Sequence, residues 1–222
     1  MINKNEVVAR VESASGIVFQ ANVQVLIIGA GACGLTAALA ASDNTNDILV
    51  LERDPEPSGS TALSSGFVPA ADTKCQRFKG IQDSAHEFNN DILAKASGKQ
   101  NSKLSKLVSY KCGKVLDWLS ERHGIDWKIL DNFLYPGHTY HRMHTVSEKT
   151  GIGLMNRLQA AIGRAGIAIS TNSLVDTIYM SNEIVSGVRV KRPNGLFEFI
   201  GCESLILACN GYGANKELVK KY

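Results

Sequence analysis

The sequence predicts an α/β protein built on a parallel β-sheet. Residues 23–28 and 48–51 are continuous apolar runs, which are typical of strands covered on both faces. An Ala- and Leu-rich helical pattern, residues 35–42, lies between them. The three segments form a βαβ unit of about 30 residues, and residues 204–208 add a further buried strand near the end of the chain.

The composition is that of a folded globular chain, with 222 residues, 44% of them hydrophobic and 20% charged. A net charge of +3 gives no indication of nucleic-acid binding. The five cysteines form no CxxC pair, and the first six residues lack the apolar core of a secretory signal, so a cytoplasmic protein with free thiols is expected. Glycines interrupt residues 25–41, which fall short of the ~20 needed to span a membrane, so no membrane span is predicted.

The first part of the chain divides into three segments. Residues 1–22 have no clear period and are interpreted as an N-terminal extension to one domain at 23–222. The βαβ unit follows, with a turn at 43–47. Residues 54–73 are rich in Pro, Gly, Ser and Thr and predict an extended functional loop.

A helical insertion is predicted at about residues 80–135. One helix covers about 83–97, and a second begins at Ser102, the expected N-cap, and reaches about 123. The second helix is expected to bury one apolar face, made of Leu104, Leu107, Val108, Val115 and Leu119.

The remaining elements are a helix and a β-meander. The helix covers about 150–165 and ends at Gly166. Short β-like runs follow at 167–169, 175–180, 184–191 and 196–200, with a Pro-Asn-Gly hairpin turn at 193–195.

Gly29, Gly31 and Gly34 form a GxGxxG motif after a strand and at the start of a helix. In this context the first glycine permits the tight turn, the second lets backbone approach a pyrophosphate, and the third lets helix and strand pack closely. Glu52, at the end of the second strand, predicts hydrogen bonds to ribose hydroxyls and would repel the 2′-phosphate of NADP. The motif predicts a dinucleotide site and leaves FAD and NAD open.

Three later segments distinguish the cofactors by resemblance: residues 58–71 (SGSTALSSGFVPAA), 137–144 (GHTYHRMH) with 150–151, and 207–217 (LACNGYGANKE). In this order the chain resembles, over about residues 23–222, the flavoprotein family of fumarate reductase and succinate dehydrogenase. The family includes soluble fumarate reductases, 3-ketosteroid dehydrogenases and tricarballylate-dehydrogenase-like proteins. Two residues depart from its pattern, since Asn210 and Ser58 stand where glycines are usual.

The resemblance implies a FAD-binding Rossmann-type sheet and a set of cofactor contacts. Glycines 29, 31 and 34 with Ala32 and Cys33 would hold the pyrophosphate, and Glu52, with Arg53 beside it, the ribose. The other implied contacts are Ser60, Thr61, Ser65 and Gly66 around the ribityl chain and flavin, Val175 at adenine through its backbone, and Ala208 and Gly211 closing over the nucleotide.

The resemblance also implies an oxidoreductase that transfers hydride to or from an activated carbon–carbon bond. The substrate would be a dicarboxylate such as fumarate or succinate, or a ketosteroid, with an electron-donor or acceptor protein as a possible partner. Ser60 stands where membrane-complex members carry a flavin-linked histidine, so FAD is expected to be non-covalent. Family members are longer, so an incomplete site without identified catalytic residues is expected here; the alternatives are a non-catalytic dinucleotide-binding fragment and an NAD-binding dehydrogenase domain.

Three histidines, His138, His141 and His144, lie within seven residues, but an extended segment would turn His141 away from the others, and no metal site is predicted. Arg142 is open to two interpretations, a fork for a substrate carboxylate or a surface arginine. Cys33, at a helix N-terminus, is interpreted as a small filler residue rather than a redox thiol.

Overall fold

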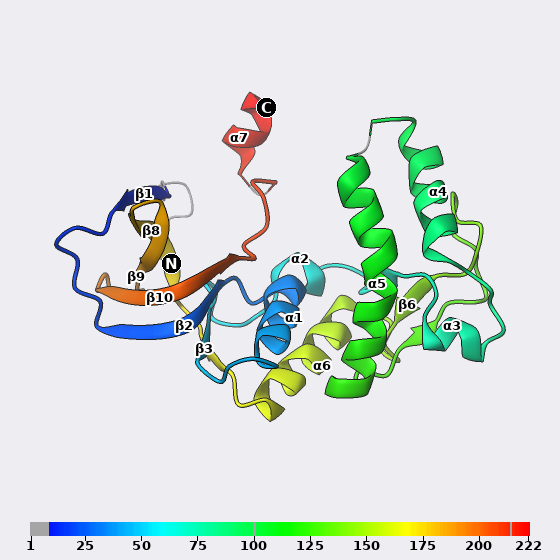
Figure 1. Ribbon diagram of the computed structural model, residues 1–222, viewed down its shortest axis with the longest axis horizontal. Coiled ribbons are helices and arrows are strands. Elements are labelled where there is room, and N and C mark those ends of the chain that lie inside the picture. The colour runs from blue at the N-terminus through cyan, green and yellow to red at the C-terminus, as the bar shows by residue number, and fades with distance from the viewer. Residues whose placement is uncertain (1–8, 100, 214) are drawn as a thin grey trace. The chain divides into compact units, whose positions relative to one another are not determined.

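A computed structural model of the chain describes residues 9–99, 101–213 and 215–222 (Figure 1). Ala214 of the resemblance segment and the first eight residues of the predicted extension lie outside them. The chain divides into a first unit, residues 1–60 and 158–222, and a second unit, residues 61–157. No described helix is long and apolar enough to cross a membrane.

The first unit is a seven-stranded, mostly parallel sheet with strand order β1-β8-β9-β10-β2-β3-β7. The pairs β1–β8, β10–β2, β2–β3 and β3–β7 are parallel, whereas β9 is antiparallel to both its neighbours. The strands are β1 (Arg10–Ser13), β2 (Ala21–Ile28), β3 (Ile48–Leu51), β7 (Ala168–Ser170), β8 (Leu174–Ser181), β9 (Ile184–Lys191) and β10 (Phe197–Leu207). This confirms the predicted α/β class.

The helices of the first unit include α1 (Ala32–Ala41) and the C-terminal α7 (Lys216–Lys221). α1 packs on β2 and β3. Two further helices, α2 (Gly59–Ala62) and α6 (Gly151–Arg164), cross the sequence boundaries between the units.

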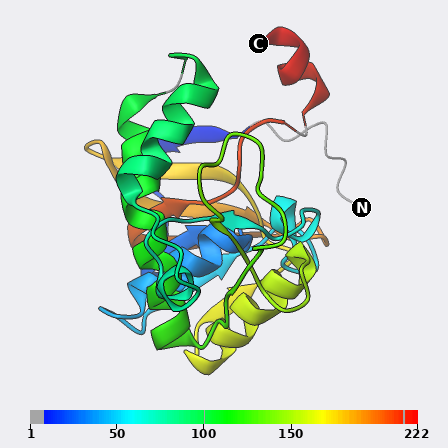
Figure 2. The same cartoon turned by 90° about the vertical axis from the view of Figure 1, so that its right-hand side faces the viewer.

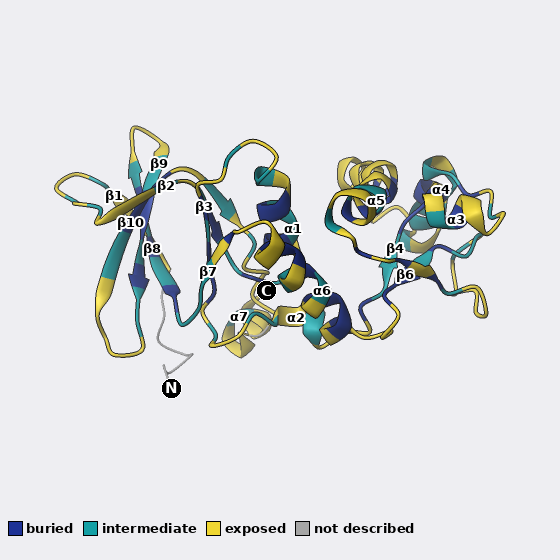
Figure 3. Cartoon of the chain, turned by 90° about the horizontal axis from the view of Figure 1, so that it is seen from below, coloured by how far each residue is buried: buried dark blue, intermediate teal, exposed yellow. Residues whose placement is uncertain are grey.

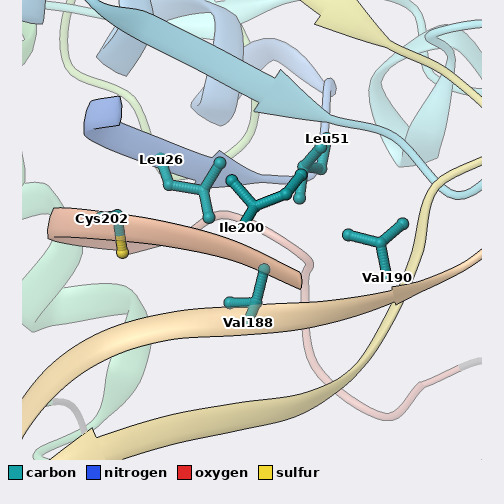
Figure 4. Close-up of a cluster of buried hydrophobic side chains, with 6 residues drawn as sticks. All are labelled: Leu26, Leu51, Val188, Val190, Ile200 and Cys202. Atoms are coloured by element: carbon teal, nitrogen blue, oxygen red, sulfur yellow. The ribbon is translucent and has the colours of Figure 1, made fainter. Parts of the chain in front are cut away.

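Strands β2 and β3 are buried on both faces, as their continuous apolar runs predict. Leu26 and Leu51 belong to a core cluster with Val188, Val190, Ile200 and Cys202 from β9 and β10 (Figure 4). Ile27 and Val50, which alternate with them, are also fully buried. This two-sided burial fixes the register of the strands that lead to the glycine turn.

Two parts of the sheet differ from the sequence prediction. β1 lies in the segment that was interpreted as an extension, and it pairs with β8 from Arg10↔Thr177 onward. The two predicted strands at 196–200 and 204–208 form one strand, β10, because the intervening Gly201 and Cys202 continue the pairing with β2. A four-residue edge strand and a mid-strand glycine leave little pattern in a sequence.

The second unit contains helices α3 (Lys74–Phe78), α4 (Ala85–Ala96) and α5 (Ser102–His123) and strands β4 (Val68–Pro69), β5 (Lys128–Ile129) and β6 (Met143–Thr145). The strands form a small antiparallel sheet in the order β4-β6-β5. Helices α4 and α5 pack side by side (Figure 2). The predicted loop at 54–73 therefore contains α2 and β4, and Asn101, rather than Ser102, caps α5.

The buried face of α5 is not the predicted one. Leu104, Leu107, Val108 and Val115 are exposed, and much of the helix surface is exposed (Figure 3). The buried residues are Ser105, Ser109, Gly113, Leu116 and Leu119. Small residues at spacings of four let another segment approach the helix closely: a Cβ at Gly113 would lie 2.1 Å from the carbonyl oxygen of Ala71. Close packing here overrides the hydrophobic pattern.

Arg142 is completely buried, which corrects both interpretations of it. Its Nε and Nη2 donate to the two carboxylate oxygens of Asp83, at 3.0 and 2.9 Å, and Nη1 donates to Asp91 at 2.6 Å. The guanidinium also lies over the ring of Phe88, 4.7 Å from its centroid. The fork holds carboxylates of its own chain, so Arg142 organises the second unit and is neither a surface residue nor a substrate contact.

His144, also fully buried, continues this polar network. Its Nδ1 lies 2.9 Å from the carbonyl oxygen of Arg142, and its Nε2 lies 2.8 Å from Oγ1 of Thr73. A carbonyl oxygen only accepts, so Nδ1 carries the proton and Nε2 accepts from the threonine hydroxyl. Thr73 Oγ1 in turn accepts from the backbone N–H of Gln76 and caps α3.

This network predicts a pH-dependent stability. Burial lowers the pKa of His144 below its ordinary value of 6.5, so the folded state prefers the neutral ring. The stabilisation is complete above about pH 6.5 and is lost as the pH falls toward the folded-state pKa. We expect the thermal midpoint to drop between about pH 7 and about pH 5, with a clearly smaller drop in His144→Asn, which cannot gain a proton. Equal pH profiles for the two proteins would exclude His144 as the titrating group.

Candidate functional site

The carboxyl ends of four parallel strands meet in one row of the first unit. Leu207, Ile28, Leu51 and Ser170 are successive register partners across β10, β2, β3 and β7. The residues that follow them, including Gly29 and Glu52, therefore lie along one edge of the sheet. In open α/β sheets this carboxyl edge is where ligands bind.

Gly29 and Gly34 are required by the chain itself. Gly29 has φ +104°, and a Cβ on it would lie 2.6 Å from the carbonyl oxygen of Ala208. A Cβ on Gly34 would lie 1.8 Å from the carbonyl oxygen of Gly29. Only glycines let β2, β10 and the start of α1 approach this closely, which matches the turn and packing roles predicted for the first and third glycines.

Gly31 is different, because a Cβ on it would meet nothing within 4 Å. Its φ of −75° is an ordinary value for any residue. Gly31 is also the N-cap of α1, with no side-chain cap and no acidic residue in the first turn. The space around Gly31 therefore lies open at the N-terminus of α1, where backbone N–H groups and the helix dipole favour a phosphate.

Glu52 is buried, with 8% of its surface exposed, and it bridges two backbone segments. Its Oε2 accepts the N–H of Ala30 at 2.8 Å, and Oε1 accepts the N–H of Asp54 at 2.9 Å. Each carboxylate oxygen has two acceptor positions, so one on each oxygen is left for a ligand hydroxyl. Glu52 thus ties the glycine turn to the end of β3, a role that the sequence did not indicate. Arg53 beside it is exposed and pairs with Asp54.

A turn at residues 171–173 adds to this edge and was missed from the sequence. Ser173 N donates to the carbonyl oxygen of Glu52 at 2.8 Å, and Asn172 N donates to that of Asp54 at 3.1 Å. Glu52 N donates to Ser170 at 2.9 Å. The sequence predicted only a short β-like run at 167–169; the parallel pairing with β3, which the structure shows, places the residues after it at the carboxyl edge.

The start of the predicted flavin loop reaches the glycine turn within the first unit. A Cβ on Gly59 would lie 3.6 Å from the Cα of Gly31. The side-chain amide of Asn210 donates to Ser60 Oγ at 2.8 Å, and Asn210 has φ +62°. Asn210 thus adopts the left-handed conformation that a glycine would favour, and it adds a contact that a glycine lacks.

Three predicted contacts, Thr61, Ser65 and Gly66, lie in the second unit. Gly66 has φ +67°, and a Cβ on it would lie 2.6 Å from the carbonyl oxygen of Thr150, so the chain itself requires this glycine. The carbonyl oxygen of Thr61 accepts from Ser64, and Ser65 is exposed. This loop is folded closely against the residues that begin α6, and its contact with a cofactor stays a prediction.

The remaining predicted contacts lie at strand ends or on the surface. Ala208 N donates to the carbonyl oxygen of Ile28, which extends the β10–β2 ladder beside Gly29, and Gly211 is exposed. The side chain of Val175 packs on the core cluster, so only its backbone is left for a ligand. Cys33 is exposed, and its interpretation as a small filler residue under the pyrophosphate stays a prediction. Among the described residues, no group of three or more His, Cys, Asp or Glu side chains is arranged to hold a metal ion.

Comparison with known proteins identifies the kind of site. The FAD binding domain family matches residues 24–222. An NADH:fumarate oxidoreductase of Klebsiella pneumoniae is 32% identical over 200 residues, which are 89% of this chain and 21% of that protein. A urocanate reductase of Eggerthella lenta is 25% identical over 204 residues, or 90% and 34% of the two chains. The chain thus spans about a fifth to a third of these relatives.

Solved structures agree with the sequence comparison. The open conformation of a flavocytochrome c3 fumarate reductase has a TM-score of 0.84 at 27% identity, covering 94% of this chain and 37% of that one. A 3-ketosteroid-Δ4-(5α)-dehydrogenase of Rhodococcus jostii RHA1 has a TM-score of 0.81 at 20% identity, covering 96% and 51%, and shows the shared fold. The resemblance stated from the sequence is confirmed, and the family match identifies the cofactor as FAD.

The contrast between Gly31 and Gly34 can be tested directly. Gly34→Ala places a methyl group against the carbonyl oxygen of Gly29, and we expect it to lower the free energy of unfolding by about 3 kcal/mol. Gly31→Ala meets no protein atom, so its loss of stability should be limited to that of the poorer N-cap, about 1 kcal/mol or less, and clearly smaller than that of Gly34→Ala. The methyl group of Gly31→Ala would occupy the space for the pyrophosphate, and FAD affinity should fall at least about tenfold.

Gly163→Ala is the matched control, since a Cβ there also meets nothing within 4 Å and the residue lies in α6. Thermal unfolding and titration of apoprotein with FAD measure both quantities for all three variants. FAD affinity of Gly31→Ala equal to that of Gly163→Ala would show that the pyrophosphate does not approach Gly31.

Proposed function

The chain belongs to the FAD binding domain family, and we propose that it forms the FAD-binding part of an oxidoreductase that transfers hydride to or from an activated carbon–carbon bond. The observation that carries this proposal is the open space at Gly31, at the N-terminus of α1 and at the carboxyl edge of the sheet. The fumarate and urocanate reductases among the relatives support the reaction class.

The edge of the proposed Rossmann-type sheet has suitable groups for the pyrophosphate and the ribose of the dinucleotide. The backbone of Gly31, Ala32 and Cys33 at the start of α1 would hold the pyrophosphate, while the remaining acceptor positions of Glu52 would bind ribose hydroxyls. Ser60, Thr61, Ser65 and Gly66 are proposed to lie along the ribityl chain and flavin. When bound, FAD supplies the hydride chemistry, and the protein positions it.

The substrate is proposed to be a small molecule with an activated double bond, either a dicarboxylate such as fumarate or a ketosteroid. An electron carrier is the proposed protein partner. The relative named as an NADH:fumarate oxidoreductase and the flavocytochrome structure support this assignment. The odd number of cysteines supports a reducing, cytoplasmic location.

Bound FAD should be non-covalent. Ser60 occupies the position of the histidine that carries flavin in the resembled membrane complexes, and its hydroxyl already accepts a hydrogen bond from Asn210. Purified protein should show the visible absorbance of flavin, and acid precipitation should leave the yellow colour in the supernatant. Flavin that stays in the pellet would contradict the non-covalent assignment, and failure of apoprotein to bind FAD would contradict the proposed function.

The 222-residue protein should bind FAD without rapid turnover. Arg142 and His144, the polar residues with the most suitable chemistry in the sequence, are fully buried in the second unit, where partners of the same chain hold them. We expect fewer than about 1 turnover per second with reduced viologen and fumarate, or with a ketosteroid and a dye acceptor. Faster turnover would show that acid–base residues lie elsewhere in this chain.

A further inference from the structure

We propose that Arg192 is a positioning residue for the adenosine end of FAD, acting through the 171–173 turn on Glu52. Arg192 follows β9 directly and belongs to no motif in the sequence. It lies in the same unit as Glu52 but 140 positions along the chain. The inference rests on the proposed function, because Glu52 is the proposed ribose ligand.

The guanidinium of Arg192 makes hydrogen bonds to the turn and to the residue before it. Its Nη1 lies 3.1 Å from Ser170 Oγ, 3.1 Å from the carbonyl oxygen of Thr171 and 2.6 Å from Ser173 Oγ. Its Nη2 donates to Glu198 on β10 at 2.6 Å, which fixes the orientation of the planar group. One side chain from the β-meander therefore contacts both the last residue of β7 and two residues of the turn that follows it.

The same segment makes backbone hydrogen bonds to Glu52. Glu52 N donates to Ser170, and Ser173 N donates back to Glu52, so both backbone groups of Glu52 are bonded to residues that Arg192 contacts. Asn172, between them, has φ +53° and donates to Asp54. Left-handed backbone is less costly for asparagine than for other non-glycine residues but still less favourable than for glycine, so the surrounding hydrogen bonds help to hold the turn.

Burial makes these contacts matter. Ser173 is 2% exposed, and the Arg192 side chain is 23% exposed, so water replaces the lost partners poorly. Without the guanidinium, Ser173 Oγ and the Thr171 carbonyl each lose a charged donor. They keep only the hydroxyl contacts within the turn, from Ser173 to Thr171 at 3.1 Å and between Ser170 and Ser173 at 3.0 Å, so the turn can release the Glu52 backbone more easily. The carboxylate would then leave the position from which it holds Ala30 and reaches ribose.

Arg189 is a close control for Arg192. It lies on β9 three residues earlier, its side chain is also 23% exposed, and it forms a two-bond ion pair with Asp176 at 2.8 and 3.2 Å. Its guanidinium also lies over the ring of Phe197. Its side chain bonds Asp176 rather than the 171–173 turn, so Arg189→Met removes a similar ion pair from β9 without acting on Glu52.

The first experiment needs no ligand. We compare hydrogen exchange of the Ser173 and Glu52 amides in the wild type, Arg192→Met and Arg189→Met. Exchange of both amides should be at least about tenfold faster in Arg192→Met and unchanged in Arg189→Met. Unchanged exchange in Arg192→Met would overturn the inference, whether or not the protein binds FAD.

The second experiment tests the two halves of FAD as separate ligands. Apoprotein is titrated with FAD, ADP and FMN, and affinity for FAD and ADP should fall about tenfold in Arg192→Met while affinity for FMN is unchanged. Arg192→Lys, which can keep one contact, should recover part of the loss, and it replaces Arg192→Met if that variant does not fold. In the double variant with Glu52→Gln the two losses should not add, because both act on one contact.

Three results separate the possible failures. Equal losses for ADP and FMN, or the same loss in Arg189→Met, would mean a general loss of structure and would overturn the role of Arg192. Additive losses with Glu52→Gln would overturn the route through Glu52. A wild-type protein that binds none of the three ligands would instead overturn the proposed function, while the exchange result would still test the connection from Arg192 to Glu52.

Discussion

The approach of Gly34 to the carbonyl oxygen of Gly29 is the constraint on which the candidate site depends. Because no side chain fits between them, α1 begins directly against the end of β2. The first N–H groups of α1 are thereby placed at the carboxyl edge of the sheet, in the space that Gly31 leaves open. A helix displaced by one methyl group would no longer begin at this point, so backbone packing, rather than any side chain, forms the candidate phosphate site.

The two units use polar groups in opposite ways. In the second unit, Arg142, Asp83 and His144 are fully or almost fully buried and satisfy one another. Such a network specifies one arrangement but leaves nothing to bind a ligand. In the first unit, each carboxylate oxygen of Glu52 accepts one backbone N–H of the chain. The second acceptor position of each oxygen remains for a ligand. A structural group differs from a candidate ligand-binding group in how many hydrogen-bonding positions remain after its bonds within the chain, and not in its residue type.

The sequence predicted the elements that rest on local pattern. The apolar runs at β2 and β3 and the glycine motif between them have strong local signals, and the structure agrees with them. The buried face of α5 was wrong because Ser105, Ser109 and Gly113 are buried by close approach, which hydropathy does not register. Arg142 was misread because its partners lie 59 and 51 positions away. Contacts between distant segments carry no period, so sequence patterns cannot reveal them.

The same limit applies to the site itself, because its parts come from both ends of the chain. Residue 29 must be a glycine because the carbonyl oxygen of Ala208 lies beside it. That contact exists only after β10 has paired with β2. The turn behind Glu52 likewise requires β7 and the residue that follows β9. Long-range parallel pairing forms slowly, since the cost of closing large loops precedes the gain. The glycine turn is therefore local in sequence but complete only when the last strand has joined the sheet, and its ligand-binding geometry is a property of the whole first unit.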